Sequence, residues 1–229
     1  MEISKNIEII GLGLKFKDNL IIGDLQIGYE ESLNKQGLMI PRFQLEEIMK
    51  ELEKIFSKHK FKRIILNGDV KHEFGRISDQ EWTDTLKIID YLQRHGEVIL
   101  IKGNHDTILD PIAKRRNLKV VEHYKEEDVT VLHGHKIIPD LSKRIIIGHE
   151  HPAISFKERP GEKFKCFLKG EYGNSTLIVM PSLNMLTVGT DITQNNLLSP
   201  FLEGNLDNFE IYVIEEDKTY DFGKLKNLI

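Results

Sequence analysis

The sequence has little cysteine and no long apolar run, and each absence excludes a class of protein. Cys166 is the only cysteine in 229 residues, which excludes an internal disulfide framework and a cysteine-based zinc cluster. Apolar runs such as residues 144–147 stop well short of the roughly 18 positions that a membrane-spanning helix needs. Residues 1–10 lack the apolar core and small-residue cleavage site of a signal peptide. We therefore expect a soluble, cytoplasmic protein.

The sequence also has no excess of positive charge. The chain carries 32 basic and 36 acidic residues, a net charge of −4, which argues against a protein that coats nucleic acid by bulk charge. Local basic segments at residues 114–116 and 157–169 could still follow a phosphate backbone. The sequence has no repeat, no low-complexity stretch and no linker rich in Pro, Gly or Ser. We expect one domain that spans residues 1–229.

Short β-rich runs alternate with helical patterns in the first part of the chain, and strands follow in the second. Apolar spacing predicts helices over residues 43–58 and 79–94, the second capped by Asp79. The predicted strands are residues 20–24, 63–67, 97–101, 129–132, 144–147, 153–156, 164–168, 176–180 and 209–215. Residues 194–205 are expected to form an ordered surface loop. This order favours an α/β fold.

Nine histidines are the abundant feature, and several of them follow predicted strands directly. Five strands end in glycine-containing motifs that carry side chains able to bind metal: Gly23-Asp24, Asn67-Gly68-Asp69, Gly103-Asn104-His105-Asp106, His133-Gly134-His135 and Gly148-His149-Glu150-His151. Ligands of open α/β sheets gather at the carboxyl ends of the strands, so these loops should converge. Oxygen and imidazole ligands suit Mn²⁺, Fe²⁺ or Zn²⁺.

The number of candidate ligands favours two ions that share a bridging carboxylate, roughly 3.5–4 Å apart. Such a pair polarises a phosphoryl group and activates a water as hydroxide for in-line attack. Taken singly, the motifs are weak: Asp24 could be a turn residue and His-Gly-His a polar turn. His149 and His151 on an extended segment would place both rings on one face. All five motifs together, each after a strand, predict a dinuclear phosphoesterase site.

The ordered motifs resemble the calcineurin-like metallophosphoesterase superfamily, whose pattern is Asp-x-His, Gly-Asp, Gly-Asn-His-Asp/Glu, a later His and Gly-His-x-His. The likeness spans about residues 20–152. Segments 23–30, 67–74, 148–152, 180–182 and 198–202 are similar to the archaeal and bacterial ligase-associated DNA-damage-response phosphoesterases, often grouped as ICC-like. The resemblance implies an αββα sandwich, in which two mixed β-sheets pack face to face between helices and the metals lie at one edge.

The resemblance also implies a role for each matching residue. Asp69 would bridge two divalent ions, with Mn²⁺ first and Fe²⁺, Zn²⁺ or Mg²⁺ as alternatives. Asp24, Gln26 and His151 would bind one ion, and Asn104, His133 and His149 the other. His105 would protonate the leaving oxygen, with its ring oriented by Asp106. Lys71 and His72 would lie at the mouth and contact phosphate, and His135 is a further candidate for substrate contact; His59, His95 and His123 match no motif.

One position departs from the family pattern, because Gln26 stands where the family has histidine. A glutamine offers an amide oxygen, which binds an ion more weakly than imidazole does. We expect lower affinity at that site, a preference for a harder ion, or occupancy by one metal when metal is scarce. Catalysis could survive through Asp69 and the ligands of the second ion, or it could be lost. Three functions are open.

The leading hypothesis is a metal-dependent hydrolase that acts on phosphodiesters or phosphomonoesters of nucleic acid, as a nuclease or end-processing enzyme in DNA repair. The first alternative is a phosphodiesterase for small or cyclic nucleotides. The second is a weakly active or inactive scaffold that partners a DNA helicase or ligase, which Gln26 favours and the intact Asn104 and His105 oppose. A homodimer is a further implication of the resemblance.

Overall fold

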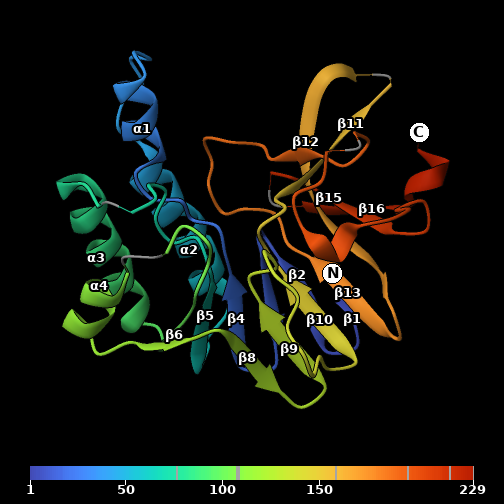
Figure 1. The fold of residues 1–229 in the computed structure, drawn as a ribbon, viewed down its shortest axis with the longest axis horizontal. Helices are drawn as coiled ribbons and strands as arrows, with labels where there is room; N and C mark the ends of the chain where they lie inside the picture. Colours follow the sequence, from blue (N-terminus) through green and yellow to red (C-terminus); the bar gives the residue numbers. More distant parts are fainter. Residues whose placement is uncertain (76, 107–108, 158, 195, 217, 229) are drawn as a thin grey trace.

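Two β-sheets packed face to face form the centre of the molecule, with α1 to α4 gathered on one side of them (Figure 1). The computed structural model describes residues 1–75, 77–106, 109–157, 159–194, 196–216 and 218–228. Within these residues, no helix is both long and apolar enough to cross a membrane.

The first sheet has seven strands in chain order, from β1 to β7. Neighbours from β1 to β4 are antiparallel, whereas β4, β5, β6 and β7 run parallel. The strands are β1 Glu2–Ser4, β2 Ile7–Ile10, β3 Gly13–Phe16, β4 Asn19–Ile22, β5 Arg63–Asn67, β6 Glu97–Ile101 and β7 Lys119–Val121. The strands expected at residues 20–24, 63–67 and 97–101 are therefore present, and β1 to β3 form an antiparallel extension that the sequence did not predict.

The second sheet has nine strands in the order β14-β11-β12-β13-β10-β9-β8, with β15 and β16 attached through β12. Strands β9, β10 and β13 run parallel, and most other neighbours are antiparallel. The strands are β8 His123–Glu126, β9 Val129–Leu132, β10 Arg144–Ile147, β11 Pro152–Phe156, β12 Arg159–Tyr172, β13 Ser175–Val179, β14 Thr190–Asp191, β15 Glu210–Glu215 and β16 Lys218–Lys224. The strand-rich second half expected from the sequence is confirmed.

Alternation along the strands divides the apolar residues among three layers of core. Ile146 of β10 lies in register between Val131 of β9 and Ile178 of β13, and all three face the space between the sheets. The neighbours Ile145 and Ile147 point to the opposite face of the second sheet. Uninterrupted apolar strands are the pattern of a sheet covered on both faces.

Helices cover the outer face of the first sheet. α2 Gln44–Lys58, α3 Asp79–Gln93 and α4 Asp110–Arg115 pack on it, whereas the short α1 Tyr29–Lys35 extends beyond the sheet (Figure 1). Ile48, Leu52 and Ile55 of α2 are buried against the sheet at the helical spacing expected from the sequence. Helix α3 also forms where it was expected, but the cap is Ser78 and not Asp79, because Ser78 forms a reciprocal capping box with Glu81.

The outer face of the second sheet has a different cover. The short 3₁₀ helices Pro200–Leu202 and Leu225–Asn227 pack there, with Phe201, Leu202 and Leu225 buried. The surface loop expected at residues 194–205, of which 195 lies outside the described residues, is therefore partly a core element. The two mixed sheets confirm the metallophosphoesterase sandwich, with α-helices covering one sheet and 3₁₀ turns and loops covering the other among the described residues.

Candidate metal centre

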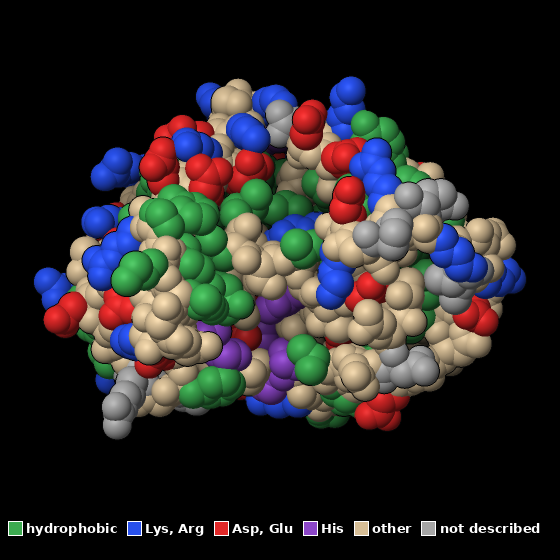
Figure 2. All heavy atoms as spheres, turned by 90° about the horizontal axis from the view of Figure 1, so that it is seen from above, with side chains coloured by type: hydrophobic (Ala, Val, Ile, Leu, Met, Phe, Trp, Pro, Cys, Tyr) green, Lys and Arg blue, Asp and Glu red, His purple; other side chains and the backbone are tan. Residues whose placement is uncertain are grey.

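The five predicted motif loops meet at one edge, where the carboxyl ends of β4, β5, β6, β9 and β10 face one another. Two glycines make the approach possible: a Cβ on Gly103 would lie 2.1 Å from Asp69 Oδ1, and a Cβ on Gly148 would lie 2.4 Å from Asp24 Oδ2. Any larger residue at either position would displace a carboxylate. Figure 2 shows histidine side chains gathered in a hollow of this face, next to exposed hydrophobic side chains.

Backbone strain is concentrated in the same loops. Asp24, Gln26, Asp69, His149 and His151 all have positive φ angles, between 47° and 65°, a left-handed conformation that non-glycine residues rarely adopt. Each such residue costs about 1–3 kcal/mol and persists only where surrounding structure enforces it. The spacing of His149 and His151 suggested an extended segment, and this prediction is wrong because both residues are left-handed. Strand β10 ends at Ile147, and two left-handed residues turn the rings toward the site.

Asp24 and His151 form one half of the cluster. Asp24 Oδ1 lies 2.9 Å from His151 Nε2, and Asp24 Oδ2 accepts a hydrogen bond from the backbone N–H of His149 at 3.1 Å. Gln26 is nearby and buried, and its Oε1 accepts a hydrogen bond from Asn184 Nδ2 at 3.2 Å. The amide oxygen that would serve as the third ligand is therefore engaged by Asn184 in this structure.

Asp69, His133, His149 and Asn104 form the other half. One ligand atom from each of Asp69, His133 and His149 lies within 4.8 Å of the others. His133 Nε2 is 3.3 Å from Asp69 Oδ2 and 3.0 Å from Asn104 Oδ1. Its Nδ1 lies 3.1 Å from the carbonyl oxygen of Asn67, a contact that orients the ring with Nε2 toward the site. The two halves are joined at His133, whose Nδ1 is also 3.7 Å from Asp24 Oδ1.

His105 lies beside the cluster, and Asp106 holds the loops around it. The Nε2 atom of His105 is 3.8 Å from Asp69 Oδ2, and its Nδ1 contacts the carbonyl oxygen of His72. The resemblance implied that Asp106 orients this ring, but the carboxylate has other partners. It accepts hydrogen bonds from the backbone N–H groups of Val70 at 3.1 Å and Gly103 at 3.0 Å. Asp106 thus ties the loop that carries Asp69 to the loop that carries His105.

The three residues expected to contact substrate lie in different environments. Lys71 is buried, not at the mouth: it pairs in a β-bridge with Ile27, and its Nζ donates to the carbonyl oxygen of Glu73. His72 is half-buried, with its ring against Tyr29 and His105. The ring of His135 lies 5.3 Å from that of His133 and 6.1 Å from that of His149, so it borders the metal-capable cluster.

Burial and mutual charge set the protonation of the cluster. Burial raises the pKa of Asp69, but the hydrogen bond and charge of His133 outweigh this effect and lower it to about 2. Burial alone would lower the pKa of His133. The hydrogen bond to Asp69 and the charges of Asp24 and Asp69 outweigh burial and raise this pKa to about 9. Burial, reinforced by His133, lowers the pKa of His149 to about 4. Asp106 has its pKa raised to about 6 by burial and by the charge of Asp69.

These residues fit a divalent cation. Asp24 Oδ1, His151 Nε2 and His135 Nδ1 are buried and have no hydrogen-bond partner among the described residues, although burying an unpaired polar atom is costly. Carboxylate oxygens, an amide oxygen and imidazole nitrogens are the donor set that Mn²⁺, Fe²⁺ and Zn²⁺ prefer. A cation at this edge would satisfy atoms that the protein itself leaves unpaired.

Several supporting residues were not identified from the sequence. Glu150 is buried inside its motif and accepts hydrogen bonds from the backbone N–H groups of Leu198 and Ser199. Lys165 belongs to the basic segment 157–169, but its Nζ turns inward to the carbonyl oxygens of Ser182 and Asn184. Burial lowers the pKa of Lys165 to about 7. Only tertiary contacts distinguish such residues from an ordinary surface lysine or glutamate.

Glu81 was also missed, although the Ser-x-x-Glu spacing of a capping box gave a signal for it. Its carboxylate accepts hydrogen bonds from the backbone N–H groups of Ser78 at 2.9 Å, Glu73 at 2.9 Å and His72 at 3.2 Å. One buried side chain therefore joins the start of α3 to the segment whose carbonyl contacts His105.

Replacing Glu81 by Gln is expected to lower the free energy of unfolding by about 2 kcal/mol. The amide keeps the size of the carboxylate. It removes the negative charge that strengthens the hydrogen bonds from the backbone N–H groups, and it replaces one accepting oxygen by an NH₂ donor. Urea denaturation of the variant measures the loss, and Asp79→Asn, an exposed position on the same helix, is the matched control. Equal midpoints for the two variants would show that Glu81 does not organise this junction.

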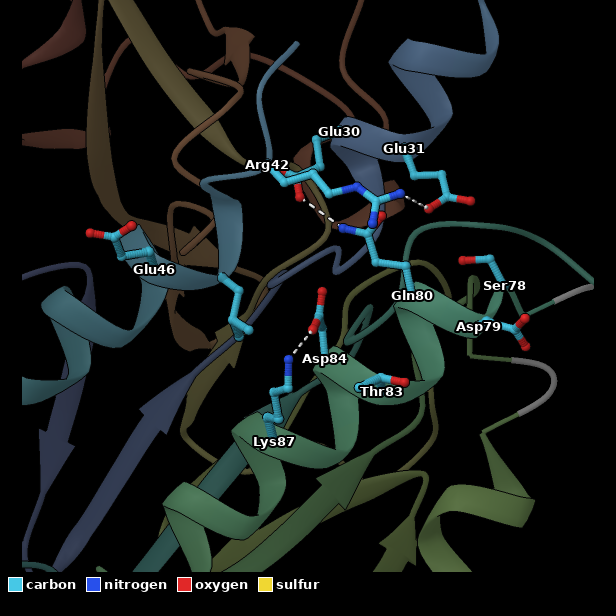
Figure 3. Close-up of a pocket in the computed structure, with 11 residues that line it drawn as sticks. Glu30, Glu31, Arg42, Glu46, Ser78, Asp79, Gln80, Thr83, Asp84 and Lys87 are labelled. Atoms are coloured by element: carbon cyan, nitrogen blue, oxygen red, sulfur yellow. Dashed lines mark hydrogen bonds and ion pairs between the residues drawn. The ribbon is translucent and has the colours of Figure 1, made fainter.

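A separate pocket of about 780 Å³ lies among α1, α2 and α3 (Figure 3). No residue of the predicted site lines it. Its polar side chains pair with each other: Arg42 lies 3.6 Å from Glu31, Gln80 donates to Glu30 at 2.9 Å, and Lys87 donates to Asp84 at 3.0 Å. Its lining has five carboxylates and two basic side chains, a balance that does not suit a phosphate ester, so the histidine-rich edge remains the candidate site.

Comparison with known proteins agrees with this geometry. The calcineurin-like phosphoesterase family model matches residues 20–176. Among 38 matching chains of solved structures, a nuclease MPE from Pseudomonas putida has a TM-score of 0.66, 16% identity and 94% coverage of both chains, which shows a shared fold. A protein of unknown function, AQ665 from Aquifex aeolicus, has a TM-score of 0.41 and 18% identity over 62% of this chain and 82% of its own. No curated protein matches.

Proposed function

Because the chain belongs to the calcineurin-like phosphoesterase family, we propose that it is a metal-dependent hydrolase of phosphate esters in nucleic acid, acting as a nuclease or on nucleic-acid ends. The similarity of its fold to that of a nuclease supports the substrate class. The narrower assignment to the ligase-associated DNA-repair branch, with its helicase or ligase partner and its homodimer, stays a prediction of the sequence.

We assign the metal ligands from the contacts at the sheet edge. Asp24 and His151, with Gln26 as a weak third ligand, would hold one ion. Asn104, His133 and His149 would hold a second, and Asp69, which lies with His133 and His149, would be the carboxylate shared by both. When bound, such ions polarise a phosphoryl group and lower the pKa of a water that attacks it, and Mn²⁺ is the expected metal.

The protein's own groups position the substrate and supply a proton. Because the Nδ1 of His105 contacts the carbonyl oxygen of His72, its Nε2 faces the site, 3.8 Å from Asp69 Oδ2. From there the ring can protonate the departing oxygen. Asp106 is a positioning residue, since it fixes the separation of the loops that carry Asp69 and His105. His72 and His135 border the space that a phosphate would enter, whereas Lys71 acts through the backbone of Glu73.

One observation carries this proposal: Asp24 Oδ1 and His151 Nε2 are buried, make no hydrogen bond among the described residues, and face each other at 2.9 Å beside the Asp69 cluster. A protein that only used the fold as a scaffold would gain nothing from burying these two atoms without hydrogen bonds, at the cost of their desolvation. The arrangement is explained when a cation occupies it during turnover.

A substrate panel tests the function. Purified protein with Mn²⁺ is expected to cleave single-stranded or duplex oligonucleotides, and short single-stranded DNA should inhibit hydrolysis of bis-p-nitrophenyl phosphate at concentrations near micromolar. Cleavage of cyclic or small nucleotides without inhibition by DNA would support the second candidate, a small-nucleotide phosphodiesterase. The acidic net charge of −4 favours that candidate, because it provides little long-range attraction for a polyanion.

Replacing Gln26 by His is expected to tighten metal binding at the Asp24–His151 half about tenfold and to raise turnover at low Mn²⁺. Imidazole is the better ligand, and Asn184 no longer competes for the donor atom. Calorimetric Mn²⁺ titration and hydrolysis rates measure the change, with Gln93→His on the exposed side of α3 as control. Unchanged activity across the whole Mn²⁺ titration would contradict this role for position 26.

A further inference from the structure

A row of four rings runs along one side of the candidate site. The ring centroids of Tyr29 and His72 are 4.7 Å apart, those of His72 and His105 are 5.7 Å apart, and those of His105 and Phe74 are 3.8 Å apart. The rings come from the start of α1, from the segment after β5 and from the loop after β6. The row thus begins at Tyr29 and ends at Phe74.

Exposure is greatest at the Phe74 end of this row. Tyr29 and His72 are half-buried, the side chain of His105 is 18% exposed, and Phe74 is 58% exposed. An exposed phenyl ring gains little from the hydrophobic effect, although fully burying one is worth about 1.5–3 kcal/mol. Phe74 therefore presents an aromatic surface to solvent directly beside the proposed proton donor. Figure 2 shows that exposed hydrophobic side chains do border the histidines on this face.

Among the described residues, two lysines near Phe74 in the structure are already engaged by Glu73. The ammonium of Lys35 lies 2.9 Å from the carboxylate of Glu73, and the ammonium of Lys71 donates to the Glu73 carbonyl oxygen. These two lysines interact with the residue that precedes Phe74 in the chain. Stacking of a ligand on Phe74 would therefore add affinity on this side of the site that does not depend on these two lysines.

We propose that Phe74 stacks against a nucleobase of the substrate, on the side of the leaving oxygen. This inference rests on the proposed function, because His105 is the group expected to protonate that oxygen. A base attached to the departing nucleoside would meet Phe74, the ring 3.8 Å from that of His105. Base–aromatic stacking is tolerant of sequence and contributes about 1–3 kcal/mol per base. Phe74 would thus select nucleoside phosphate esters over simple ones without reading sequence.

Binding to abasic oligonucleotides tests the stacking without requiring catalysis. Fluorescence anisotropy with EDTA present compares a single-stranded hexanucleotide with versions that lack one base each. At one position, loss of the base is expected to weaken binding to the wild-type protein about tenfold and to leave binding to Phe74→Ala unchanged. Phe74→Trp should retain the base dependence and Phe74→Leu should lose it, since leucine is apolar but cannot stack. Phe222→Ala, a remote exposed ring that packs on Phe156, is the control.

The outcomes separate this inference from the proposed function. Oligonucleotides that bind in a Phe74-dependent manner but are not cleaved with Mn²⁺ would support stacking and overturn the function. Cleavage with the same KM in wild type and Phe74→Ala would support the function and overturn stacking. Equal sensitivity of both proteins to every abasic position, or no binding of any oligonucleotide, would likewise overturn the stacking role.

Discussion

Replacing Asp69 by Asn is expected to reduce phosphodiester hydrolysis at least about a thousandfold and to remove most bound metal. Asp69 is almost fully buried, and its carboxylate contacts His133 at 3.3 Å and lies 3.8 Å from His105. The asparagine side chain keeps the shape and still accepts the backbone N–H of His105. What it loses is the negative charge that would be shared by both ions, so the defect should be chemical and not structural.

Metal analysis and steady-state kinetics on the same preparations measure this effect. Asp140→Asn is the matched control, because that carboxylate is exposed and pairs only with Lys125 among the described residues. Its metal content and rate should equal those of the wild type. If Asp69→Asn retains both metal and activity, the ions are held elsewhere and the site assigned here is wrong.

Replacing His105 by Ala is expected to lower kcat about 10²- to 10⁴-fold while leaving the metal content unchanged. The ring lies beside Asp69 but outside the assigned ligands, and it is placed to give a proton to the leaving oxygen. The loss should depend on the leaving group. An alkoxide such as a nucleoside hydroxyl needs that proton, whereas p-nitrophenolate departs without it.

Rates for a nucleotide ester and for bis-p-nitrophenyl phosphate therefore test the role of His105 directly. The variant should be impaired far more on the first substrate than on the second. His59→Ala, at the end of α2 and outside every motif, controls for the removal of a histidine. An equal loss on both substrates together with loss of metal would instead make His105 a structural or metal-binding group.

Motif position along the chain predicted that the five loops would come together, because each motif follows directly after a strand. Strands β5, β6, β9 and β10 are short apolar runs, and the residues after each of them are the proposed ligands. Parallel strands bring their carboxyl ends to one edge, so local pattern and topology agree. The glycines of the motifs then prove necessary for a distinct reason: Gly103 and Gly148 leave room for the carboxylates of Asp69 and Asp24.

What the sequence could not predict depends on contacts between distant segments. Lys71 looked like a phosphate ligand at the mouth, but the β-bridge to Ile27 buries it. Asp106 looked like the partner of the His105 ring, but its carboxylate satisfies the N–H groups of Val70 and Gly103. In both cases only the folded chain determines which atoms face each other.

The N-terminal strands were missed for a different reason. β1, β2 and β3 are three or four residues long and are separated by tight turns with positive φ at Asn6 and Gly11. Runs this short give little periodicity on which a prediction can depend. Their stability comes from Ile3, Ile7 and Leu14, which pack into the core between the two sheets. Through β3 they flank β4, an interior strand of the first sheet that leads directly to Asp24.

The most direct test of the central claim is to strip the wild-type protein with EDTA, reload it with Mn²⁺, and measure metal per chain and phosphodiester hydrolysis on the same samples. We predict that the stripped protein is inactive and that hydrolysis returns in proportion to the metal bound. Hydrolysis that persists in the stripped protein, or Mn²⁺ that binds fully without hydrolysis above the buffer rate, would contradict the assignment of this edge as a metal-dependent phosphoesterase site.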